Sequence, residues 1–263
     1  MDKALAAARW LFDAHERREP FRPLPGEFSP RNAEEAYLIQ DEFVALRAKR
    51  LGSVAGYKIA LSSVAMQKFV GVDRPQAGAM LESTLRRSPA AVRASDYVRL
   101  IAEFEIAVRL AEDLPAADAP FSRERVAQSV GAVMAAIELA DDRNADYALL
   151  PKHPLDLIAD NTWNAGAVLG APAKDWRKLD LAALRGVASI NGATVGEGRG
   201  ADAMGHPFAA VAWIADLLAS QGRAMLRGDV VITGSLVTTK AMNAGDRARF
   251  SLEGLGDVEL RVD

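Results

Sequence analysis

The stretch IAEFEIAV, residues 101–108, alternates two sets of side chains with a period of two. This period is typical of a β-strand, whose successive side chains point to opposite faces. Glu103 and Glu105 would then lie side by side on one face, where their like charges repel unless a cation compensates them. A bound cation is one compensation. The alternative is a solvated outer face on which Arg99 and Arg109 weaken the repulsion.

The composition of the chain limits the classes of function. It has 263 residues, a net charge of −3 from 32 basic and 35 acidic residues, and no cysteine. The charge balance gives no electrostatic case for nucleic acid or an anionic membrane. The lack of cysteine excludes disulfides, thiolate zinc sites and cysteine nucleophiles, and fits a reducing cytoplasm. No apolar run approaches the roughly 20 residues that span a bilayer.

The pattern along the chain predicts an α+β fold with a mainly antiparallel, curled sheet or barrel and helices packed outside. The alanine-rich start predicts an amphipathic helix over residues 2–18, not a signal peptide. Ser29-Pro30 is an N-cap signal for a second helix that runs to about Arg50. Short β-like runs then follow, with Asn191-Gly192 as a strong hairpin signal. We expect a helical N-terminal part over residues 1–55 and a catalytic domain over residues 56–263.

Two further charged residues sit in apolar surroundings. Glu138 falls at the end of a helix predicted to start at Ser122, and it is either paired with Arg143 or directed at Glu103 and Glu105. Three converging carboxylates would suit a hard divalent ion such as Mg²⁺ or Mn²⁺. Lys58 lies in a short predicted strand. It either snorkels outward or faces the carboxylates, where it could hold an anionic substrate or carry a proton.

The remaining polar motifs are less informative. Residues 160–166, DNTWNAG, are either a turn with local hydrogen bonds or a pocket wall that presents amide donors. His15 is expected to be exposed, and the three histidines show neither metal spacing nor a partner serine, which argues against a hydrolytic triad. Residues 71–78 and the glycine-rich residues 196–200 are expected to be loops.

Eight short motifs follow one another along the chain. They are GYKIALSS (56–63), GVDRP (71–75), EFE (103–105), ELADDR (138–143), DN (160–161), GHP (205–207), Trp213 and GDVVITGS (228–235). In this order the motifs resemble the 2-keto-4-pentenoate hydratase and 4-oxalocrotonate decarboxylase family, within the fumarylacetoacetate hydrolase superfamily. The similarity is collinear over about residues 30–250.

The resemblance implies a β-roll fold, and a Mg²⁺ or Mn²⁺ site formed by Glu103, Glu105 and Glu138. It implies a small-molecule substrate, a 2-oxo or 2-hydroxydienoic acid from aromatic catabolism, and a metal that acts as a Lewis acid. Lys58 would bind this substrate and move a proton. The resemblance also implies a homo-oligomer of dimers or larger, and it allows a complex with a related enzyme of the pathway. The expected substrate contacts are Gln76, Asn161, Trp163, Asn164 and Ser235.

Three departures from the family pattern concern the substrate more than the metal. Gln76 stands where hydratases often carry Asp, and an amide cannot carry a proton. Trp163-Asn164 replaces two serines, and Ala60 replaces a glycine. A hydratase is our first interpretation, ahead of a decarboxylase, an acylpyruvate C–C hydrolase and a non-catalytic partner subunit. Whether residues 70–82 form a lid is left open by the sequence.

Overall fold

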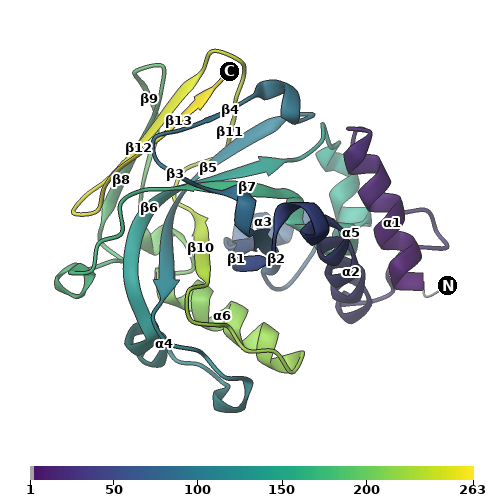
Figure 1. Ribbon diagram of the computed structural model, residues 1–263, viewed down its shortest axis with the longest axis horizontal. Helices are drawn as coiled ribbons and strands as arrows, with labels where there is room; N and C mark the ends of the chain where they lie inside the picture. The colour runs from purple at the N-terminus through teal and green to yellow at the C-terminus, as the bar shows by residue number, and fades with distance from the viewer. Residues whose placement is uncertain (1–2) are drawn as a thin grey trace.

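The structure, a computed structural model, describes residues 3–263 and contains two β-sheets flanked by six α-helices (Figure 1). The large sheet has the spatial order β2 (Gln76–Leu81), β1 (Val54–Ala60), β10 (Val230–Ser235), β5 (Leu100–Leu110), β6 (Val130–Asp141), β7 (Asn164–Leu169) and β3 (Leu85–Arg87), with β11 (Lys240–Ala241) paired to β5. The small sheet has the order β4 (Ala90–Val92), β13 (Gly256–Val262), β12 (Arg247–Leu252), β8 (Arg185–Ile190) and β9 (Ala193–Arg199).

The helices lie at the sides of the large sheet. They are α1 (Lys3–Glu16), α2 (Ala33–Leu51), α3 (Val64–Val70), α4 (Arg123–Ser129), α5 (Pro154–Ala159) and α6 (Pro207–Ser220). Figure 1 shows α1, α2 and α5 gathered at one end of the molecule, and α6 below β10. None of the helices in the described chain combines the length and hydropathy that crossing a bilayer requires.

The predicted α+β class is confirmed. Most neighbouring strands are antiparallel, and the parallel pairs are β1 with β10, β3 with β7 and β4 with β13. Within residues 3–263 the path of the large sheet ends at β2 and β3, so the sheet is open rather than a closed barrel. The Asn191-Gly192 turn joins β8 to β9 with positive φ at both residues, as its sequence predicts.

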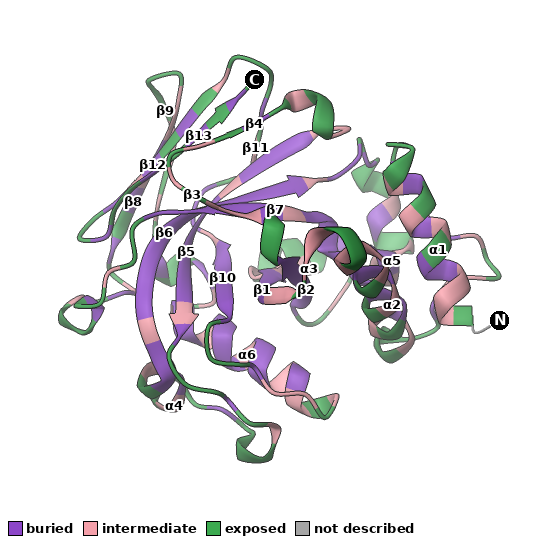
Figure 2. Cartoon of the chain, viewed as in Figure 1, coloured by how far each residue is buried: buried purple, intermediate pink, exposed green. Residues whose placement is uncertain are grey.

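The large sheet is buried on both faces over β5 and β6 (Figure 2). One face of β5 contributes Phe104 and Ile106 to the main hydrophobic core, which continues to Phe250 of the small sheet. The other face carries Glu105 and Ala107, and Ala107 packs in a smaller apolar cluster with Met134 and Ile232. The alternation in residues 101–108 therefore separates an apolar core face from a face that holds buried charge.

The helix predicted from Ser122 through Ile137 is wrong beyond Ser129. Helix α4 ends there, and β6 begins at Val130. Because both faces of β6 are buried, its sequence is a continuous apolar run without the alternation that marks a strand. Periodicity alone cannot separate such a run from a buried helix, and Val130, Val133 and Ile137 are β-branched residues that favour the strand.

Two segments expected to be loops, residues 71–78 and 196–200, are partly strands. Gln76 to Gly78 belong to β2, whose residues are all buried, so no polar alternation marks it. Gly196 and Gly198 belong to β9, where a Cβ on Gly198 would lie 1.9 Å from the Leu236 carbonyl oxygen. These glycines permit a close approach of backbone rather than a flexible loop.

The N-terminal helices pack against the sheet domain. Helix α2 starts at Ala33 with Asn32 as its N-cap, so the predicted cap at Ser29 is wrong. The sequence offered both residues, and residue type does not choose between them because Asn and Ser cap helices about equally well. The Gln40 side chain donates to the carbonyl oxygens of Ala77 in β2 and Ile158 in α5. Residue 2 of the first predicted helix lies outside the described residues. The domain division at residue 55 stays a prediction.

Candidate metal centre

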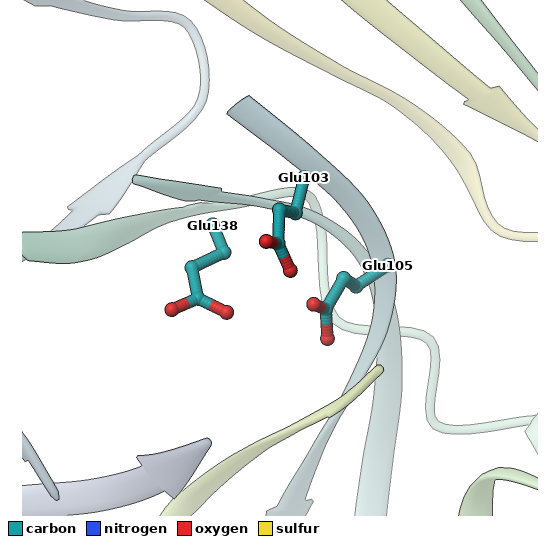
Figure 3. Close-up of side chains that lie close together, drawn as sticks. All are labelled: Glu103, Glu105 and Glu138. Carbon is teal, nitrogen blue, oxygen red and sulfur yellow. The ribbon is translucent and has the colours of Figure 1, made fainter. Parts of the chain in front are cut away.

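Three glutamates converge on one face of the large sheet (Figure 3). Glu103 of β5 lies directly opposite Glu138 of β6, and Glu105 follows two residues along β5 on the same face. One carboxylate oxygen from each residue lies within 4.8 Å of the others. The helical position expected for Glu138 is wrong, but the strand that replaces it directs the side chain to the same place.

The cluster is costly in electrostatic terms. Glu105 and Glu138 are both fully buried. Burial, Glu138 and Glu103 raise the pKa of the Glu105 carboxyl well above its usual range. Burial also raises the pKa of the Glu138 carboxyl to about 7, although Lys58 opposes the shift. A positive charge is the natural compensation for such a group.

Lys58 supplies part of that charge. Its side chain is 3 % exposed, so it does not snorkel to solvent, and its Nζ lies 3.1 Å from Glu138 Oε1. Burial alone would lower the pKa of the Lys58 ammonium, but the three glutamates raise it. Strands β10 and β5 lie between β1 and β6, about 14 Å in a flat sheet. The contact between Lys58 and Glu138 therefore requires both long side chains to extend toward each other across the inner face of the curled sheet.

The donor set fits a hard divalent cation. Gly234 N donates to Glu105 Oε2 at 2.6 Å, and Asn164 Nδ2 donates to Glu138 Oε1 at 3.0 Å. The other oxygens, Glu105 Oε1 and Glu138 Oε2, are buried without a hydrogen-bond partner among the described residues. Buried acceptors of this kind need a partner, and carboxylate oxygens are what Mg²⁺ and Mn²⁺ prefer.

A strained turn lies beside the cluster. Asn161, Thr162 and Trp163, the 3₁₀ turn η5, all have positive φ, between 48° and 60°. A left-handed backbone costs a non-glycine residue roughly 1–2 kcal/mol, so the surroundings must hold this turn in place. The Thr162 carbonyl oxygen lies 3.5 Å from Lys58 Nζ.

The turn is fitted against β2. The Asn161 side chain exchanges two hydrogen bonds with the backbone of Ala79, at 2.7 and 2.9 Å. A Cβ on Gly78 would lie 2.5 Å from Thr162 Oγ1. Gly78 is opposite Lys58 in the β1–β2 ladder, so the Thr162 hydroxyl lies on the lysine's side of the sheet. The sequence did not single out Thr162, since threonine in a polar turn carries no signal of its own.

Two of the family departures face each other. Gln76 lies directly opposite Ala60 in the β1–β2 ladder, on the face that carries Lys58. Gln76 Nε2 donates to the Pro154 carbonyl oxygen at 3.0 Å, whereas its buried Oε1 has no partner among the described residues. Gln76 also borders a groove of about 1380 Å³ between α2, α5, α6 and residues 71–76. The three glutamates are not in its lining.

The other expected substrate contacts lie around the turn and β5. Asn164 holds Glu138, as described above. Trp163 packs edge-on against Phe21 at 5.4 Å, and its buried Nε1 has no partner among the described residues. The Ser235 hydroxyl accepts from Phe104 N and donates to the Val237 carbonyl oxygen. Substrate binding by these residues stays a prediction.

A second buried charged cluster corrects the expectation for His15 and decides between the two alternatives for Glu138. His15 is not exposed: its Nε2 lies 2.6 Å from Asp160 Oδ1. Arg143 pairs through Nη2 with Asp160 Oδ2 and not with Glu138. The separation of His15 from Asp160 by 145 residues explains why no local pattern predicts this cluster.

The sequence of this chain matches those of known proteins. Residues 53–263 match the model of the fumarylacetoacetate (FAA) hydrolase C-terminal family. The chain belongs to this family. It is 34 % identical over 255 residues to 2-keto-4-pentenoate hydratase of Paraburkholderia phymatum, covering 96 % of this chain and 94 % of the relative. It is 32 % identical over 253 residues to 2-hydroxyhexa-2,4-dienoate hydratase of Comamonas testosteroni, covering 95 % of this chain and 94 % of the relative.

A solved structure shares the whole fold. The 4-oxalocrotonate decarboxylase of Pseudomonas putida G7, complexed with magnesium and adipate, superposes with a TM-score of 0.91 and 26 % identity, over 99 % of this chain and 97 % of that one. The predicted family and fold are therefore confirmed.

Proposed function

We propose that this protein is a Mg²⁺- or Mn²⁺-dependent lyase that hydrates 2-hydroxydienoic acids, with a 2-keto-4-pentenoate type of substrate. The observation that carries the proposal is the convergence of Glu103, Glu105 and Glu138 beside a buried lysine. The hydratase relatives, which align over nearly the whole chain, support the choice of substrate.

Each residue has a proposed task. The three glutamates hold the ion, which when bound supplies Lewis-acid polarisation of the substrate's 2-oxygen and carboxylate. Lys58 stands at 3.1 Å from Glu138, close enough to the same centre to bind the substrate's negative charge and to give or take a proton at Nζ. Its raised pKa keeps Lys58 charged in the metal-free protein, so we assign it first to charge stabilisation.

The substrate contacts are proposed from their place around this centre. Asn164 and Thr162 flank Glu138 and Lys58, and the Gln76 amide offers an acceptor on the same face of β1 and β2. Asn161, Trp163 and Ser235 are the other proposed substrate contacts. Asn161 is proposed to act indirectly, through the hydrogen bond between its side chain and the backbone of β2. Hydration needs ketonisation of the dienol with a proton at C5, followed by addition of water across the resulting C3=C4 bond, with the hydroxyl at C4 and a proton at C3. Gln76 Oε1 is proposed to orient this water without deprotonating it.

A decarboxylase is the second candidate. The structural match to 4-oxalocrotonate decarboxylase supports it, and Gln76 in place of a carboxylate removes a proton carrier that hydratases often have. Both reactions would use the same ion and the same lysine. An oligomer of dimers or larger and a cytoplasmic location stay predictions.

The test is a substrate panel with Mg²⁺ or Mn²⁺, containing 2-hydroxypentadienoate, 2-oxohexenedioate and an acylpyruvate, with products identified by mass. We expect gain of water from 2-hydroxypentadienoate. Loss of CO₂ from the dioate alone would replace the hydratase by the decarboxylase, and C–C cleavage would indicate a hydrolase. If no compound turns over while the ion binds, the protein is not the proposed enzyme.

A further inference from the structure

The motif ELADDR, residues 138–143, contributes Glu138 to the metal centre, but its last residue has no part in the chemistry above. Arg143 is 1 % exposed and has positive φ. Its Nη1 donates to the Glu19 carbonyl oxygen at 3.3 Å and its Nη2 to the Asp160 carboxylate. A buried arginine of this kind has to be paired, and here its partner immediately precedes the strained η5 turn.

Asp160 joins three parts of the chain. One oxygen binds Arg143, which follows β6, and the other binds His15 of α1, at 2.6 Å. Burial would raise the pKa of the Asp160 carboxyl, but Arg143 and His15 lower it to about 2. Asp160 is therefore an anion fixed from two sides. His15 is itself held in place, with its ring centroid 4.9 Å from that of Phe43 in α2.

Asp160 directly precedes the turn whose residues contact Lys58 and Glu138. The Asp160 carbonyl oxygen accepts from Trp163 N at 3.1 Å and so closes the turn. Within that turn the Thr162 carbonyl oxygen faces Lys58 Nζ. Asn164, the first residue after the turn, donates to Glu138. Movement of Asp160 would thus move two groups that set the positions of the lysine and of one metal ligand.

We infer that His15, Asp160 and Arg143 form a positioning network that holds the η5 turn, and through it the Thr162 carbonyl and the Lys58 ammonium, in the geometry for turnover. The three are positioning residues, because their link to Lys58 and Glu138 runs through Asp160 and the backbone of the turn. The inference rests on the proposed function. It gives the N-terminal helix α1, outside the matched family region that begins at residue 53, a part in catalysis.

His15 is the residue to vary, since it is the outermost of the three. His15→Phe keeps a ring beside Phe43 but removes the hydrogen bond to Asp160, whereas His15→Gln keeps a donor near the Nε2 position. His153 supplies the matched control: its Nδ1 lies 3.8 Å from Asp156 Oδ2 and its side chain is half-exposed. His153→Gln and His153→Phe therefore disturb a second histidine–aspartate pair, at the opposite end of α5 from Asp160 and without a side-chain hydrogen bond that caps the helix.

The expected result separates positioning from folding. With kcat normalised to the number of bound Mn²⁺ ions and measured well below the melting temperature, His15→Phe should lower kcat at least tenfold. KM and the Mn²⁺ dissociation constant should change less than threefold. His15→Gln should recover kcat to within threefold of the wild type, and both His153 variants should match the wild type.

Hydrogen exchange gives a readout that does not need turnover. The amides of residues 161–164 should exchange at least tenfold faster in His15→Phe than in the wild type or His15→Gln. The inference would be overturned if His15→Phe had the kcat and the exchange rates of the wild type. It would also be overturned if kcat fell equally in His15→Phe and His15→Gln. A wild-type protein that turns over no panel substrate would refute the proposed function, while the exchange result would still decide whether the network holds the turn.

Discussion

At the scale of single residues, the site is defined by an imbalance of charge. Three glutamates meet one lysine, and two of the glutamates are fully buried. Glu138 and Lys58 form a close ion pair, which leaves Glu105 without a cation of its own. Burying unpaired carboxylate is unfavourable, so the arrangement is stable only where protons or a metal ion supply the missing positive charge.

This imbalance predicts how metal binding depends on pH. Because the pKa of Glu138 is raised to about 7, the ion competes with a proton below that pH. For each proton that the ion displaces, the Mn²⁺ dissociation constant should fall by up to about tenfold per pH unit between pH 5.5 and 7. Calorimetry in buffers of different ionisation enthalpy should show proton release at pH 6. A pH-independent constant would contradict the raised pKa.

The same shift has a consequence for stability. The folded, metal-free protein keeps a proton on Glu138 up to about pH 7, whereas the unfolded chain releases it near the usual pKa of 4.5. The contribution of this group to stability is therefore fully present below pH 4.5 and is lost as the pH rises through about 7. Urea unfolding in EDTA should therefore show a lower free energy of unfolding at pH 8 than at pH 6.

Lys58→Met tests the role of the lysine. We expect kcat to fall by about 10²–10⁴-fold, since the variant loses both a positive charge and a proton donor. Mn²⁺ should still bind, because the three carboxylates remain. A wild-type rate in this variant would remove Lys58 from the mechanism, and loss of the ion would make it a structural support of the metal centre instead.

At the scale of elements, the strand that the sequence predicts well is the one with two chemically different faces. Residues 101–108 alternate because one face enters the apolar core and the other holds the glutamates. Strands β6 and β2 could not be predicted in the same way, because both of their faces are buried and no alternation remains. Lys58 and Glu138 of the candidate site were singled out by their charge in apolar surroundings, a signal that does not depend on the element.

The contact between β2 and the η5 turn can be tested with Gly78→Ala. A Cβ there would lie 2.5 Å from Thr162 Oγ1 and 2.7 Å from the Asn161 carbonyl oxygen, so the turn must shift. We expect kcat to fall at least tenfold. Gly192→Ala is the control: its positive φ of 83° should cost about 1 kcal/mol of stability, but no atom lies within 4 Å. Equal activity in the two variants would argue against a role for the β2 contact.

At the scale of the whole molecule, the N-terminal helices and the sheet domain share buried polar contacts. Gln40 binds the backbone of β2 and α5, and His15 binds Asp160. These contacts join residues 37, 118 and 145 positions apart, so no local sequence pattern predicts them. The sequence therefore suggested an exposed His15 and a domain boundary at residue 55.

These contacts predict that the two parts unfold together. Urea unfolding followed by far-ultraviolet circular dichroism and by tryptophan fluorescence should give coincident transitions, with one midpoint within error. Two separated transitions would mean that residues 1–55 form an independent unit and that their contacts with β2 and α5 contribute little.

The three-glutamate centre is tested by Mn²⁺ titration and by turnover of 2-hydroxypentadienoate, each compared between the wild type and Glu105→Gln. Glutamine keeps an acceptor for Gly234 N but replaces the buried, unpartnered oxygen with a neutral amide, so the fold should persist. The assignment of the three glutamates as metal ligands predicts one ion per chain in the wild type, and in the variant an affinity at least about 100-fold weaker with no turnover. Wild-type affinity and activity in Glu105→Gln would contradict it.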